Sequence, residues 1–196
     1  MKKIVFGSMT AALALAATPA LSQSVNGVVN ITANVPGKCQ VVSPGPAGSS
    51  FTSTVDLGDI SAADGTLLPS ATLAALFNAG GSQTANLQFQ VVCNTATPQV
   101  TVDSDPIVSA TPAATGYANR VDYTGTVVFT TIPGSVTVNN ASTAASATST
   151  ALNGRLVTGG SNVTVTASNF ATANATDVLV AGAYAGVINI TIAPAP

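Results

Sequence analysis

Apolar and polar residues alternate most regularly along 25–35. Alternate positions carry apolar or small side chains, namely Val25, Gly27, Val29, Ile31, Ala33 and Val35. The intervening positions are polar except for Val28. Because successive side chains of a strand point to opposite faces, this pattern predicts a β-strand with one buried face.

Shorter alternations of the same kind recur along the rest of the chain, separated by turn residues. They predict strands at 51–60, 84–93, 121–132 and 178–192, and strands that begin at Val100, Val136 and Val163. Loops are expected at 43–50, 105–115 and 139–153, the last a mobile one rich in Ser, Thr and Ala. Several short strands with scarcely any helix predict an all-β antiparallel sandwich.

One segment, 67–79, fits two structures. Ser70 can cap a short helix there and Gly80-Gly81 can end it, but a strand at a sheet edge fits the same residues.

The first residues have the pattern of a bacterial secretory signal peptide. Met1-Lys2-Lys3 is positively charged, 4–17 is mostly apolar, and Ala20-Leu21-Ser22 fits a cleavage site. A retained membrane anchor is the alternative, but the apolar run is too short for one. We therefore expect residues 1–22 to be a signal peptide, 23–196 to form a single domain, and the mature protein to be exported.

Charged residues make up only 6% of the chain, and it contains no His and no Trp. After removal of the leader, the cations are Lys38, Arg120 and Arg155, against seven acidic residues, all Asp. Nucleic-acid binding requires a basic face, so we expect no nucleic-acid partner. Tyr117, Tyr123 and Tyr184 can in principle stack on a sugar, although core packing is expected for Tyr123 and Tyr184.

The residues do not favour an enzyme. Without His, neither a Ser-His-Asp nor a Cys-His arrangement can form. Two groups of acids, 103–105 and 56–64, can be imagined as a carboxylate pair or a calcium site, but Asp is also a common turn former. We expect no catalytic residues, no cofactor, no metal and no small-molecule substrate.

Cys39 and Cys93 are the only cysteines. In an exported protein such a pair is expected to form a disulfide. A metal or redox pair is the alternative, and the absence of His and of a CxxC spacing argues against it.

Several motifs, in order, resemble those of chaperone–usher pilus subunits, especially the archaic class that shares the spore coat protein U domain. The run 24–39 is similar to the mature N-terminus of these subunits. Later matches are Leu57-Gly58-Asp59-Ile60, the strand 87–93 that ends in Cys93, Asn119-Arg120, and Ala181-Gly182-Ala183-Tyr184. The chain departs from the family at its end, where Ala-Pro-Ala-Pro replaces an aromatic residue.

The resemblance implies an incomplete immunoglobulin-like β-sandwich completed by a donor strand. A periplasmic chaperone would fill the gap first, and at an outer-membrane usher the N-terminal strand of a neighbouring identical or related subunit would replace it. The candidate donor strand is 23–33, with Val25, Val29, Ile31 and Ala33 as the residues that fill pockets. The implied product is an extracellular, cell-surface pilus that supports adhesion and biofilm formation.

Two alternatives stay open at the level of sequence. Segment 25–35 can be an ordinary first strand packed in its own core, because alternation does not tell whose groove is filled. The protein can also be a self-contained secreted β-sandwich that binds glycan or coats the cell surface as a monomer. The two functions differ in whether the fold is complete without a partner.

Overall fold

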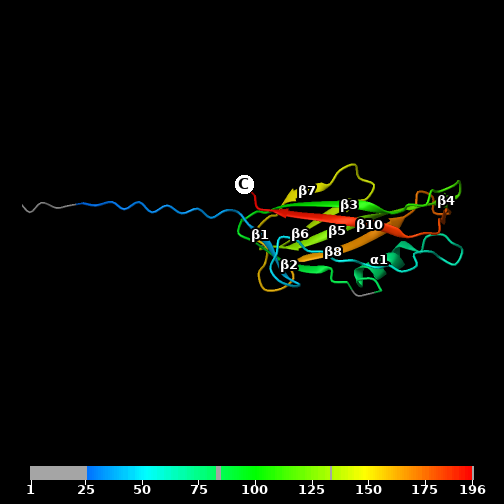
Figure 1. The fold of residues 1–196 in the computed structure, drawn as a ribbon, viewed down its shortest axis with the longest axis horizontal. Helices are drawn as coiled ribbons and strands as arrows, with labels where there is room; N and C mark the ends of the chain where they lie inside the picture. The colour runs from blue at the N-terminus through cyan, green and yellow to red at the C-terminus, as the bar shows by residue number, and fades with distance from the viewer. Residues whose placement is uncertain (1–25, 83–84, 133, 196) are drawn as a thin grey trace, which may run out of the picture. The chain divides into compact units, whose positions relative to one another are not determined.

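The computed structural model describes residues 26–82, 85–132 and 134–195 (Figure 1). The chain divides into two compact units, 1–35 and 36–196, and each is described by itself. The expected signal peptide, 1–22, and Val25 lie outside the described residues.

The larger unit consists mainly of β-strands, with one short helix among the described residues. The strands are β1 (Cys39–Ser43), β2 (Gln88–Cys93), β3 (Gln99–Ser109), β4 (Tyr117–Ala118), β5 (Arg120–Thr130), β6 (Ser135–Ala141), β7 (Thr148–Ala151), β8 (Val163–Ala171), β9 (Val178–Leu179) and β10 (Tyr184–Ala193). The helix is α1 (Ser70–Asn78). The all-β class predicted from the alternating pattern is therefore confirmed.

Eight of the strands form one antiparallel sheet, in the order β1-β2-β8-β5-β3-β10. β6 adds to β5, and β7 adds to β3 on the side away from β10. β4 and β9 form a separate parallel pair. β1 and β10 are thus the two ends of the sheet order, and β10 pairs with β3 along one of its edges only, within the part of the chain described.

The core lies on the face where the alternate apolar residues of the central strands meet. Along β5, every second residue from Val121 to Phe129 is buried, while the residues between them are partly exposed. β8 shows the same period over Val163, Val165 and Ala167. Because side chains alternate between the two faces of a strand, this period of two places the apolar residues on the face that excludes water and the others on the solvated face.

The disulfide joins the two paired strands β1 and β2. Cys39 lies directly opposite Cys93 in the register, and their sulfur atoms are 2.08 Å apart. The predicted disulfide is therefore present, and it closes a loop with a sequence separation of 54.

The helix alternative is confirmed for 67–79. The expected cap at Ser70 is wrong, because Ser70 is the first residue of α1 and the N-cap is Pro69, which has no side-chain cap hydrogen bond. The helix ends where Gly80 and Gly81 both adopt positive φ. The N–H of Gly80 donates to the carbonyl oxygen of Phe77, and that of Gly81 to Leu76. This closure satisfies the last carbonyl groups of the helix, as glycine C-caps commonly do.

Several predictions of local structure in the larger unit are wrong. The expected strand 178–192 is divided into β9 and β10, and residues 180–183 between them are in no strand. Segment 51–60 is not a strand but an extended segment with one isolated bridge, between Asp56 and Gly81. The expected loop at 105–115 is in strand as far as Ser109, and the expected loop at 139–153 contains the end of β6 and all of β7. β7 forms without large side chains because backbone pairing with β3 and the Thr101–Ser149 hydroxyl contact at 2.7 Å hold it.

The described part of the N-terminal unit, 26–35, contains no strand, and its side chains are exposed. Val29 and Ile31 are 86% and 90% exposed, and Val35 is 79% exposed. The expected strand is therefore absent from residues 26–35. A β-strand requires a neighbouring backbone to satisfy its N–H and C=O groups, and residues 26–35 pair with none.

Candidate functional site: an open apolar groove

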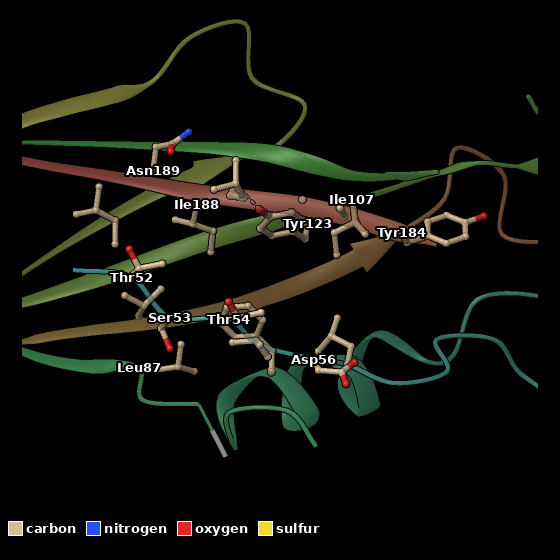
Figure 2. Close-up of a pocket in the computed structure, with 18 of the residues that line it drawn as sticks. Thr52, Ser53, Thr54, Asp56, Leu87, Ile107, Tyr123, Tyr184, Ile188 and Asn189 are labelled. Atoms are coloured by element: carbon tan, nitrogen blue, oxygen red, sulfur yellow. Dashed lines mark hydrogen bonds between the residues drawn. The ribbon is translucent and has the colours of Figure 1, made fainter. Parts of the chain in front are cut away.

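A long open groove runs beside β10, with a volume of about 1240 Å³ (Figure 2). β10 forms one wall, and the extended segment 51–60 forms the other. The floor consists of apolar side chains that belong to the core. They are Phe77, Leu87, Phe89, Val91, Ile107, Tyr123, Val165 and Phe170. The groove is thus a place where the core of the larger unit is open to solvent.

The β10 wall presents a row of isoleucines. Ile188, Ile190 and Ile192 lie opposite Ser104, Val102 and Val100 of β3, and all three pack against the buried core while remaining partly exposed. Since the second edge of β10 has no partner in the described chain, its backbone groups can accept another strand. An unpaired edge next to apolar side chains is a template for strand addition.

The opposite wall also has unpaired backbone. Within the described residues, the N–H and C=O groups of 51–55 take part in no backbone hydrogen bond. Asp56 anchors the wall, because its carbonyl oxygen accepts from the N–H of Ser82 and its carboxylate accepts from Gly58. The alternation at 51–60 does not form a strand because 51–55 pairs with no other backbone among the described residues.

Aromatic side chains support both halves of the floor. Phe51 of the wall packs on Phe89 of β2, with ring centroids 4.2 Å apart. Tyr123 stacks with Phe170, with centroids 5.7 Å apart. The floor therefore contains large aromatic side chains that pack on one another.

Tyr123 also fixes the position of the β10 wall. Its hydroxyl donates a 2.8 Å hydrogen bond to the carbonyl oxygen of Val187. Burial, together with the charge of Asp105, raises the pKa of Tyr123 above its ordinary value of 10.0. Gly186, where the β3–β10 register shifts, has no room for a Cβ because Ile107 and the Pro106 carbonyl lie against it.

Charged groups lie on the rim of the groove rather than in its floor. Asp56 and Asp59 belong to turns, and bonds from Ser61 lower the pKa of Asp59 below its ordinary value of 3.8. Asp64 binds Thr66 in the same way. Within the described ranges, no group of three or more His, Cys, Asp or Glu residues could hold a metal ion. The hydrogen bonds to Asp56, Asp59 and Asp64 from the residue two positions later are typical of turn-forming Asp.

The residues singled out from sequence fall in different places. Cys39 lines one end of the groove, and its disulfide partner Cys93 is buried beside it. Val29, Ile31 and Ala33 lie in the exposed N-terminal segment, and Val25 is outside the described residues. The resemblance implied a gap in the sandwich, but none of the residues that line this groove was predicted to do so; the alternation of Ile188, Ile190 and Ile192 was a usable signal for one of its walls.

No protein-family model, curated protein or solved structure matches the chain. Within the described ranges, no helix has the length and apolar character needed to span a membrane.

Proposed function

We propose that this protein is a structural subunit of an extracellular bacterial pilus, assembled by chaperone–usher donor-strand exchange. The observation that carries the proposal is the open apolar groove beside the unpaired edge of β10, in a chain that also exposes an alternating apolar segment. Each copy would have one strand to give and one groove to fill.

The segment and the groove are chemically complementary. Residues 26–35 supply unpaired backbone and the apolar side chains Val29, Ile31 and Ala33 on one face. The groove supplies unpaired backbone on both walls and an apolar floor. Burying a Val or Ile side chain fully contributes about 1.5–3 kcal/mol, so Val29 and Ile31 are the main anchors, and Val25 extends the same face.

The inserted strand would complete the fold. Placed between β10 and 51–60, it would pair with the free edge of β10 and cover the exposed core. This arrangement would correspond to the incomplete immunoglobulin-like sandwich that the resemblance to archaic, spore coat protein U type subunits implies. Because a donated segment and an accepting groove are different surfaces, contacts between copies are head-to-tail and do not close on themselves. The product is a filament.

The partners follow from the same physics. Before assembly, an open groove and a free edge promote aggregation, so a periplasmic chaperone would cover the groove and an outer-membrane usher would exchange it for the next subunit. The chain would be exported through the periplasm to a cell-surface pilus, where adhesion and biofilm formation are the expected roles.

Deletion of residues 23–31 tests the proposal. The full mature chain and the truncated chain are expressed in a periplasm with the cognate chaperone and compared by size-exclusion chromatography and electron microscopy. We expect filaments from the full chain, and a folded one-to-one chaperone complex without filaments from the truncated chain. Filaments from the truncated chain would contradict donor-strand exchange, and a stable full-length monomer without any partner would favour a self-contained secreted module.

A further inference from the structure

A second, smaller pocket of about 150 Å³ lies against β4 and the start of β5. It is lined by Tyr117, Asn119, Arg120, Asp122 and Asp177, among others, and shares none of these residues with the groove. In Figure 1, β4 lies at the end of the larger unit away from β1. We propose that this β4 pocket binds a single ring of a neutral sugar, a function that does not rest on the proposed pilus assembly.

The polar side chains of the β4 pocket are held in place by other bonds. Arg120 contacts Asp122 at 2.7 Å and donates to the carbonyl oxygen of Ser142. The amide nitrogen of Asn119 donates to the carbonyl oxygen of Thr111 at 3.0 Å. Side chains fixed in this way lose little freedom when a ligand binds, which favours affinity.

The same side chains keep hydrogen-bonding capacity to spare. Three donors converge on one carboxylate oxygen of Asp122, Oδ1: two nitrogens of Arg120 and the hydroxyl of Ser142. Within the described residues, the other oxygen of Asp122 and the Nη1 of Arg120 have no hydrogen-bond partner. A guanidinium donor thus lies beside a carboxylate acceptor, and neighbouring sugar hydroxyls, which both donate and accept, match such a pair.

The charges favour a neutral ligand over an ionic one. Two carboxylates, Asp122 and Asp177, oppose an anion such as phosphate or sialic acid. The guanidinium of Arg120 lies beside Asp122 and opposes a metal ion, which would also need several free carboxylate oxygens. A neutral sugar ring is repelled by neither the carboxylates nor the guanidinium, and its hydroxyls can donate to the former and accept from the latter.

Tyr117 supplies the apolar part of the site. The residue is 48% exposed. The hydroxyls of the other two tyrosines, Tyr123 and Tyr184, instead donate to backbone carbonyl oxygens. An aromatic ring beside fixed polar groups can cover the C–H face of a sugar while the polar groups bind its hydroxyls.

An array of neutral and sialylated oligosaccharides tests the proposal, probed with the purified mature chain both as monomer and as fibre. Methyl glycosides of the hexoses that bind on the array are then titrated by calorimetry. We expect binding to neutral sugars, reduced by about tenfold or more in Tyr117→Ala and in Asp177→Asn. Tyr117→Phe keeps the ring and should bind more tightly than Tyr117→Ala.

Asp105→Asn is the matched control, because it removes the same charge from an exposed position on β3 outside the β4 pocket. It should leave the affinity unchanged, and thermal unfolding of each variant checks that the fold is intact. Binding to acidic glycans only, no binding in either form of the protein, or equal affinity in Asp177→Asn and the parent would each overturn the proposal.

Discussion

The hydroxyl of Tyr123 in β5 donates to the carbonyl oxygen of Val187 in β10, 2.8 Å away. This bond crosses from the core to the edge strand at the point where the register with β3 shifts. It therefore helps to hold β10 in position while its other edge has no partner in the described chain.

Replacement of Tyr123 by Phe removes this bond and keeps the ring. We expect the free energy of unfolding to fall by about 1 kcal/mol, as for loss of one hydrogen bond, measured by denaturant titration. Hydrogen exchange of the Val187 and Ile188 amides should be faster in the variant. Unchanged exchange along β10 would show that the hydroxyl does not hold the strand.

The same residue predicts a dependence on pH. Burial raises the pKa of Tyr123 above the ordinary value of 10.0, so above that pH the unfolded chain releases the phenolic proton while the folded chain keeps it. The unfolded state then binds fewer protons than the folded state, and stability falls as pH rises. Above pH 10.0, the free energy of unfolding should fall less steeply with pH in Tyr123→Phe than in the parent. Equal slopes would contradict the account.

The disulfide between Cys39 and Cys93 should stabilise the larger unit strongly. Closing a loop with a sequence separation of 54 removes unfolded-state entropy worth about 4 kcal/mol in the simple chain model. The double variant Cys39→Ser, Cys93→Ser should lose stability of this order in denaturant titration. If reducing agent destabilises the double variant as much as the parent, the effect does not come from this bond.

Gly81 is predicted to be required for the wall of the groove. It has a φ of +70°, and a Cβ there would overlap the carbonyl oxygen of Asp56, which anchors 51–60. Gly81→Ala should lower the free energy of unfolding by about 1–3 kcal/mol, from backbone strain. Gly48→Ala, where a Cβ meets nothing closer than 3.9 Å, is the control and should change stability little.

The regular strands were predictable because their local pattern and their final environment agree. Along β5 and β8, each apolar residue of the alternation is buried, and the two cysteines face each other across β1 and β2. Local alternation is sufficient where the strand pairs with at least one other strand of the same chain.

The remaining elements depend on contacts that a local pattern does not contain. Segment 51–60 alternates like a strand, yet among the described residues it has one isolated bridge and no strand partner. β7 has no large side chains and is held by pairing with β3. The β4 pocket brings Tyr117 and Asp177 together through the parallel pair of β4 and β9, which are far apart in sequence. The position of the groove depends on β10 being an edge, which only the strand order reveals.

Binding of the N-terminal segment to the groove is the central claim, and thermal unfolding tests it most directly. The mature chain without residues 23–35 is released from its chaperone and mixed with a peptide of sequence 23–35. The melting temperature should rise with peptide concentration, because a ligand that binds only the folded state stabilises it. A control peptide with Val29→Asn and Ile31→Asn should give little rise. If the truncated chain is already a stable monomer and neither peptide shifts its melting temperature, the groove is not the site of strand exchange.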